Sequence, residues 1–253
     1  MTCDLSEIVH SANFEALLAS MEDSIHYHET PPDLATVLCI YRAASCLEFA
    51  SYQAFAVSAL NNFYPDTALN IPKFNAKAPV YSHAIDVMRL GRENISQLAG
   101  VLKRTFYELA RAPGDLLRFC GQGTTAASFN DICRLGTVKQ HLAYAWLTLA
   151  TTAHWKATNC SGGDSCRINK FQSHLRKNYV LQCGNDPLYG IEKLLSEADS
   201  LEACAECLAA WRASLEDRRN GIWEDLADWI DMPETDTESE SESSSPAARP
   251  NSP

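Results

Sequence analysis

Two pairs of cysteines in the second half of the chain constrain its fold most strongly. The first pair, Cys160 and Cys166, encloses Ser-Gly-Gly-Asp-Ser, whose glycines favour a turn, and the second pair, Cys204 and Cys207, lies just inside a predicted helix. Thirty-seven residues separate the two pairs, which is enough for the chain to fold back and bring four thiolates together. Tetrahedral zinc takes four such ligands at about 2.3 Å, often from two short cysteine loops. The sequence therefore predicts a structural zinc site at Cys160, Cys166, Cys204 and Cys207.

Two other readings of these cysteines stay open. Free cysteine is one of the most often buried residue types, so the ten cysteines could be reduced core side chains without a metal. His154 or His174 could also replace one thiolate, because each lies within several residues of the first pair. In every case we expect the cysteines to determine architecture and not a reaction.

Charge and composition narrow the class of protein. The 253 residues can form one large or two small domains, and 46% hydrophobic with 21% charged residues is ordinary for a globular protein. The net charge is -11, of which residues 231–253 carry -5 through six acids and one base. An acidic chain without a basic stripe argues against nucleic acid as a partner. Its densest basic cluster would be spread over more than one helix face, and consists of Arg167, Lys170, Arg176 and Lys177.

The ends and hydropathy of the chain predict an intracellular protein, cytoplasmic or nuclear. The first residues, Met-Thr-Cys-Asp-Leu-Ser-Glu, lack the basic and apolar segments of a signal peptide. No stretch approaches the roughly 20 apolar residues of a membrane-spanning helix, so no membrane partner is expected. A reducing compartment disfavours disulfides, which leaves metal binding or burial for the cysteines.

Apolar residues recur at helical spacing along most of the chain, and no run alternates convincingly at period two. The spacing predicts helices over 11–21, 48–63, 82–93, 96–111, 128–155, 165–179 and 187–198, one more beginning after the cap residue Asp33, and a long last one with apolar residues from Leu201 to Trp229. The fold class predicted is all-α, an irregular multi-helix bundle with a long C-terminal helix. Residues 233–253, rich in Ser, Glu and Pro, cannot bury a core and are predicted to be a disordered acidic tail.

Several motifs together resemble a known family. Residues 33–45, Asp-Leu-Ala-Thr-Val-Leu-Cys-Ile-Tyr-Arg-Ala-Ala-Ser, and residues 49–60, Phe-Ala-Ser-Tyr-Gln-Ala-Phe-Ala-Val-Ser-Ala-Leu, resemble the helical end of a BTB/POZ domain from mushroom-type (basidiomycete) fungi. Residues 84–95, Ala-Ile-Asp-Val-Met-Arg-Leu-Gly-Arg-Glu-Asn-Ile, and the region of both cysteine pairs through Trp229 are similar to the helical part that follows this domain. The likeness covers roughly residues 14–232.

The resemblance implies a division of the chain and a function. Residues 1–65 would be a helical remnant of a BTB/POZ domain, residues 79–232 a helical C-terminal domain with the cysteine pairs, and residues 233–253 the tail. The family implies a non-enzymatic protein–protein interaction module or scaffold, in some members an adaptor of cullin-type ubiquitin ligases. A complete BTB domain has strands upstream of its helical end, so we expect this chain to lack the strands and much of the surface that contacts a cullin.

The alternative is an enzyme of unknown reaction with a cysteine or histidine site. Cys120 and Cys133 flank a Gly/Thr-rich stretch, and a reactive thiolate there would need nearby positive charge. The sequence Gly121-Gln-Gly123 lacks the lysine of a P-loop and follows no predicted strand. Neither G-x-S-x-G nor HExxH is present. We therefore predict no enzyme, no catalytic residue and no cofactor other than structural zinc.

Overall fold

The computed structural model is all-helical, as the sequence predicts. It describes residues 10–22, 27, 30–114, 127–152, 157, 159–163, 166, 168, 182–200 and 202–232, and no strand occurs within these ranges. The main helices are α1 (Ser11–Glu22), α3 (Leu34–Cys46), α4 (Ala50–Phe63), α5 (Pro79–Ser82), α6 (Ala84–Glu93), α7 (Ile95–Ala110), α8 (Phe129–Thr152), α10 (Pro187–Ser196), the short 3-10 helix η4 (Ala198–Ser200) and α11 (Ala205–Trp229). The predicted tail, 233–253, and almost all of the predicted helix 165–179 lie outside the described residues.

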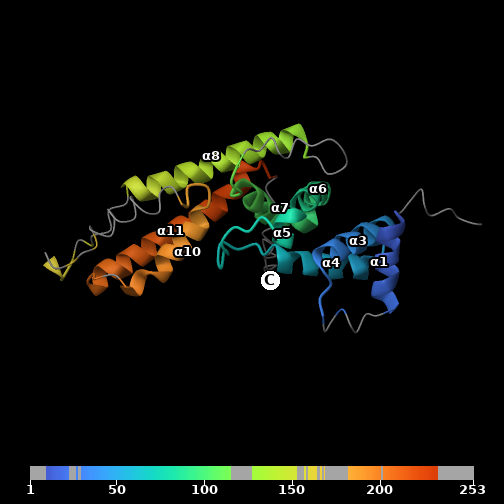
Figure 1. Ribbon diagram of the computed structural model, residues 1–253, viewed down its shortest axis with the longest axis horizontal. Helices are drawn as coiled ribbons and strands as arrows, with labels where there is room; N and C mark the ends of the chain where they lie inside the picture. The colour runs from blue at the N-terminus through green and yellow to red at the C-terminus, as the bar shows by residue number, and fades with distance from the viewer. Residues whose placement is uncertain are drawn as a thin grey trace, which may run out of the picture.

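The helices form two groups that share their middle elements. Figure 1 shows α1, α3 and α4 together at one end, and α8 with α11 extending toward the other. The first core contains apolar residues of α1, α3 and α4, and the second contains those of α8, α10 and α11. Helices α6 and α7 contribute to both: Val87 and Val101 lie in the first core, while Met88 and Leu102 lie in the second. The division at residues 65 and 79 stays a prediction, since the two cores adjoin through these shared helices.

The beginning and the end of α3 follow from local chemistry. Asp33 caps its first turn by accepting a hydrogen bond from the backbone N–H of Thr36 at 2.8 Å, as predicted. At the other end Glu48 has a φ of 58°, which lets the N–H of Phe49 reach the carbonyl of Ala44 at 2.9 Å. The predicted helix 48–63 therefore begins later, at Ala50, because Glu48 turns the chain out of α3. This turn also leaves Phe49 43% exposed, although its apolar side chain continues the helical spacing of the predicted helix 48–63.

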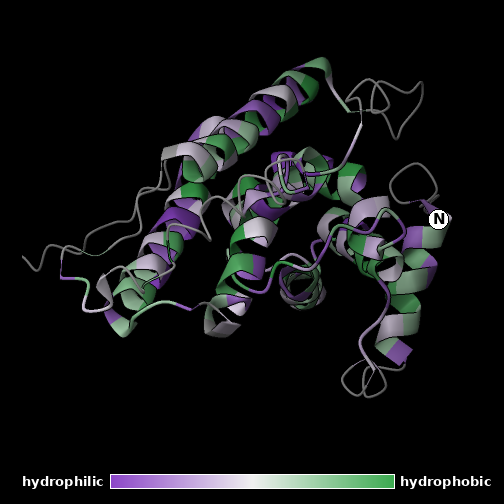
Figure 2. Cartoon of the chain, turned by 60° about the vertical axis from the view of Figure 1, so that its left-hand side comes forward, coloured by the Kyte–Doolittle hydropathy of each residue, from purple (hydrophilic) through white to green (hydrophobic). Residues whose placement is uncertain are grey.

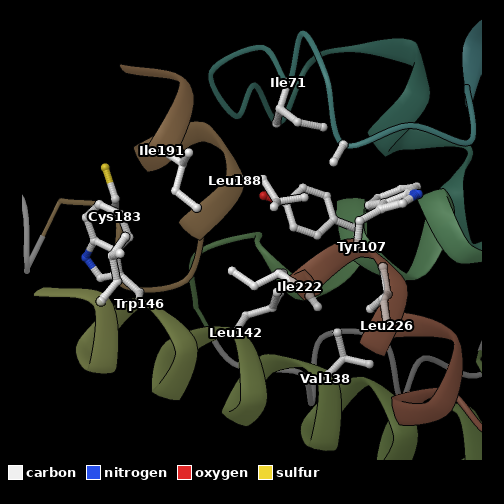
Figure 3. Close-up of a cluster of buried hydrophobic side chains, with 14 of the residues drawn as sticks. Ile71, Tyr107, Val138, Leu142, Trp146, Cys183, Leu188, Ile191, Ile222 and Leu226 are labelled. Carbon is white, nitrogen blue, oxygen red and sulfur yellow. The ribbon is translucent and has the colours of Figure 1, made fainter. Parts of the chain in front are cut away.

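The apolar stripes predicted for α7 and α8 are confirmed as buried. Figure 2 shows hydrophobic and hydrophilic residues alternating along the same helices, as expected of helices with one buried face. The stripe of α8 meets α10 and α11 in the second core, where Figure 3 places Leu142 near Ile222 and Trp146 beside Cys183. The buried stripe residues are Leu98, Val101, Leu102, Thr105, Phe106 and Leu109 in α7, and Leu135, Val138, Leu142, Trp146 and Leu149 in α8.

A glycine in α10 allows the closest approach in this core. A Cβ at Gly190 would lie 2.6 Å from the indole ring of Trp146 and 2.9 Å from Cβ of Cys183. Atoms cannot come this near without displacement, so α10 packs on α8 at a distance that only glycine permits.

Charged side chains are also buried between α7 and α10, which the sequence analysis did not predict. Arg104 donates a hydrogen bond to the carboxylate of Glu108 at 3.0 Å, and Arg111 donates another to the same carboxylate at 2.9 Å. Arg111 reaches across to Asp186, just before α10, at 3.1 Å, and Asp186 accepts a hydrogen bond from Tyr107 as well. The two cations and two carboxylates balance, which fits the rule that buried charges are paired.

Candidate metal centre

The two predicted cysteine pairs lie at the end of the layer formed by α8, α10 and α11. The first pair is in the segment that follows α8, and the second is at the beginning of α11. In Figure 1 the short yellow segment of the first pair lies near the beginning of α11. The chain therefore returns over the intervening residues to bring both pairs to one place, as the spacing predicts.

The sulfur atoms form one compact group. The Sγ atoms of Cys160, Cys166, Cys204 and Cys207 all lie within 4.8 Å of one another, and Sγ of Cys160 is 3.6 Å from Sγ of Cys204. Cys207 is fully buried, whereas the other three are partly exposed. Four thiols this close, with one of them in the core, could hold a metal ion.

The second pair sits on the N-terminus of α11 and not inside it. Cys204 occupies the N-cap position with an extended backbone, and Cys207 is the third residue of the helix. This corrects the prediction that Cys204 lies within the helix. The correction has a chemical consequence, because the free N–H groups and the positive end of the helix dipole stabilise thiolates at this position.

Backbone donors and burial act differently on the individual thiols. The N–H groups of Cys207 and Gly162 lower the pKa of Cys204 to about 6. The N–H groups of Cys204 and Ile168 likewise lower the pKa of Cys166. Burial raises the pKa of Cys207 to about 12, although the N–H of Ala157 donates to its sulfur at 3.3 Å. The site thus combines stabilised thiolates with a buried thiol that a bound cation would ionise, a donor set suited to a metal.

The loop between Cys160 and Cys166 is shaped to pack on α11. A Cβ at Gly162 would lie 2.9 Å from Cβ of Cys166 and 3.3 Å from Cβ of Cys204, so a larger residue would separate the pairs. Next to it, Ser161 donates to the carboxylate of Glu206 in the first turn of α11 at 2.7 Å. Five residues lie between Cys160 and Cys166, which is more than usual for a metal-binding loop. Gly162 allows this longer loop to pack closely against Cys204 at the beginning of α11.

One of the remaining sequence candidates is described, and it lies apart from this group of sulfurs. Cys133, a candidate reactive thiol, lies in α8 and its side chain is exposed. Surface hollows of about 250, 510 and 630 Å³ in the described part are lined by neither cysteine nor histidine. The other candidates named from the sequence lie outside the described ranges. They are Cys120, the glycines at 121 and 123, His154, His174 and the basic cluster Arg167, Lys170, Arg176 and Lys177.

None of the helices within the described ranges is both long and apolar enough to span a lipid bilayer. Comparison of the chain with protein-family models, with curated proteins and with solved structures gave no match.

Proposed function

We propose that the chain is a non-enzymatic helical scaffold for protein–protein interaction, with one structural zinc ion at the four cysteines. The main observation in favour of a zinc site is the group of four thiols, whose sulfur atoms all lie within 4.8 Å of one another. A tetrahedron with Zn–S bonds of about 2.3 Å has sulfur atoms about 3.8 Å apart. The separation of 3.6 Å between Cys160 and Cys204 is already near this value, so small side-chain movements would complete the site.

The donor set favours zinc in a structural role. Four thiolates select zinc or iron–sulfur chemistry over oxygen-seeking cations such as magnesium and calcium. Four protein ligands leave no position open for water or substrate, which is the arrangement of structural sites. The ion would join the segment after α8 to the first turn of α11, and its binding energy would stabilise this end of the fold.

The interaction part of the proposal rests on two further features. The first is the resemblance to BTB/POZ proteins, which act by binding other proteins, in some cases as ubiquitin-ligase adaptors. The second is the exposed surface: α4 contains no charged residue, and α8 exposes Phe129 (79%), Tyr144 (68%) and Leu147 (49%). Large apolar side chains in solvent favour a surface that a partner covers.

Native mass spectrometry of the full chain tests the zinc. We expect a mass excess of one zinc per chain that a chelator removes, with a lower melting temperature afterwards. The variant Cys204→Ser should lose the ion and melt at a lower temperature. Cys133→Ser, which removes a thiol outside the site, should keep both the ion and the melting temperature. A chain that purifies without metal, or a Cys204→Ser variant that still binds it, would refute the centre.

A separate experiment tests the interaction. A tagged full chain is expressed in cells, and co-purifying proteins are quantified against the variant Leu147→Asp, a change at a position of α8 that is 49% exposed and does not belong to the group of four cysteines. We expect partners that are recovered with the wild-type chain and depleted with the variant, while the zinc content of both stays the same. Identical recovery from the two chains would exclude this face of α8 as the interaction surface.

A further inference from the structure

We infer that the groove between α8 and α11 binds a basic amphipathic helix of a partner protein. The groove has a volume of about 510 Å³, and its lining runs from Ala210 to Trp229 of α11, with Ala145 contributed by α8. The inference rests on the scaffold role proposed above, to which it adds a binding site and a class of partner. It does not depend on the zinc ion.

The length and the walls of the groove fit a helix. The lining extends from residue 210 to residue 229, which is about 28 Å of helix at about 1.5 Å per residue. An extended peptide binds by adding to the free backbone groups of a sheet edge. The walls of this groove are helices, whose backbone N–H and C=O groups bond within the helix. A helical partner satisfies its own backbone, so it can lie along such walls.

Gly221 in the groove is required by a close partner and not by the described part of the chain. It lies inside α11, where glycine costs about 1 kcal/mol relative to alanine. A Cβ at this position would have nothing within 4 Å, whereas a Cβ at Gly190 would meet Trp146. Ala213 and Ser214, about two turns earlier, also line the groove and are small. Small side chains along one face let a second helix approach closely.

The charge of α11 selects a basic partner. Asp217 and Asp225 line the groove, and both side chains are exposed. The exposed charged residues of α11 between positions 216 and 228 are five acids and one base: Glu216, Asp217, Arg218, Glu224, Asp225 and Asp228. A second copy of the chain would bring the same acidic helix and a net charge of -11 to this surface, which is unfavourable. Lysine or arginine on a partner helix would instead meet the carboxylates.

Aromatic side chains at one end of the groove offer apolar contact. Trp229 is partly exposed, and its ring stacks on that of His141 in α8, with centroids 4.8 Å apart and 12° between the ring planes. Tyr144 follows His141 by three residues, so the two are neighbours on the surface of α8, and Tyr144 is 68% exposed. Aromatic side chains within a polar rim are typical of binding surfaces. The apolar side of the partner helix would cover these rings.

Binding of a synthetic helix to the full chain tests the inference. The probe is a fluorescein-labelled peptide of about 19 residues, the length of the groove, with alanine and leucine along one face and lysine along the other. The control peptide has glutamate in place of every lysine, and fluorescence anisotropy measures both dissociation constants. We expect the basic peptide to bind once per chain, more weakly at high salt, and the acidic peptide not to bind. Equal binding of the two peptides, or binding of neither, would overturn the inference.

Variants place the binding at the groove. Gly221→Leu puts a large side chain in the groove and should weaken binding of the basic peptide at least about tenfold. Gly221→Ala should cause a smaller loss in a chain that melts at a higher temperature, so lost binding is separated from lost stability. Asp225→Lys should weaken binding about five- to tenfold. Glu15→Lys makes the same change of charge at an exposed position of α1 and should alter binding by less than about twofold. Equal losses in the two lysine variants would indicate attraction to the overall charge and contradict a site in the groove.

Sedimentation of the full chain without peptide tests a second copy as the occupant. A concentration-dependent dimer that Gly221→Leu abolishes would assign the groove to another copy of the chain and overturn the inference. The failures of the two proposals are distinguishable. Cellular partners that depend on Leu147, together with no binding of the basic peptide, would refute the groove site and keep the scaffold. Peptide binding by a chain that contains no zinc would refute the metal centre and keep the groove site.

Discussion

Replacing Arg111 by methionine tests whether the buried charges between α7 and α10 stabilise the fold through pairing. Arg111 is 4% exposed, and its guanidinium donates to Glu108 at 2.9 Å, to Asp186 at 3.1 Å and to the carbonyl of Pro72 at 2.7 Å. The variant would leave two buried carboxylates with one cation, Arg104. Breaking a buried pair in this way costs about 3–5 kcal/mol, a large part of the stability of a typical domain. The pairing also raises the pKa of Arg111 despite its burial, so the native state favours the charged form.

Urea unfolding at 25 °C and pH 7, followed by circular dichroism, measures this cost. The control is Arg218→Met, the same change at an exposed position of α11, which should alter the free energy of unfolding by less than about 0.5 kcal/mol. If Arg111→Met does not fold, Arg111→Lys keeps the charge without the planar fork and should cost about 1–2 kcal/mol. Equal effects at positions 111 and 218 would refute the reasoning.

The pH dependence separates lost pairing from lost packing. Burial raises the pKa of Asp186, and a carboxyl whose native pKa exceeds its unfolded value adds stability at low pH that is lost as the pH rises. Loss of Arg111 should raise this pKa further. The deficit of Arg111→Met, measured against the wild-type chain at each pH, should therefore shrink as the pH falls from 7 toward about 4. A deficit that does not change with pH would indicate packing alone.

Four other positions have geometries that decide the sign of a substitution. Glu48→Gly should raise the melting temperature through a gain of about 1 kcal/mol, because a φ of 58° strains any residue with a Cβ, and a decrease would contradict this. Gly190→Ala should lower the free energy of unfolding by about 1–3 kcal/mol, because the added Cβ would meet Trp146. Gly221→Ala should raise it by up to about 1 kcal/mol, because nothing lies within 4 Å of the added Cβ and alanine favours a helix. Thermal unfolding measures both variants, and effects of the same sign would refute the comparison. Asp33→Ala should lose about 1 kcal/mol and Asp33→Asn almost nothing. The hydrogen bond from a backbone N–H lowers the pKa of Asp33. The stability that the cap contributes should therefore be fully present above the ordinary carboxyl pKa and be lost as the pH falls through the lowered value. Urea unfolding at pH 7 and at pH 3 measures this change, and a cost of Asp33→Ala that is the same at both pH values would contradict it.

Local patterns predicted most of the helices correctly because they depend on near neighbours in the chain. The period of apolar residues in 96–111 and 128–155 lies within each segment, and the observed α7 and α8 bury these residues. Asp33 marks the start of α3 for the same reason, since a cap bonds to an N–H three residues on. The grouping of the four cysteines was predictable from ligand spacing, although not from the longer loop of the first pair taken alone.

Other features depend on which distant segments meet. Nothing local distinguishes Arg104, Glu108 and Arg111 from solvent-exposed charges, because their burial follows from the approach of Asp186, 75 residues beyond Arg111. The turn at Glu48 was missed since the apolar pattern of α4 continues back through Phe49. Cys204 was placed inside its helix for a similar reason, because periodicity marks the buried face of a helix and not its first residue.

The sequence by itself determined that this chain forms amphipathic helices and carries thiols spaced to meet. Helix propensity, periodicity and capping are interactions over a few residues, and they act in the same way in any fold. Only the tertiary structure decided how the thiols differ. It buried Cys207, placed backbone N–H groups against Cys166 and Cys204, and left Cys160 3.6 Å from Cys204. The physical reason is that burial and hydrogen-bond donors come from segments far apart in the chain, so the reactivity of each thiol is set when those segments pack.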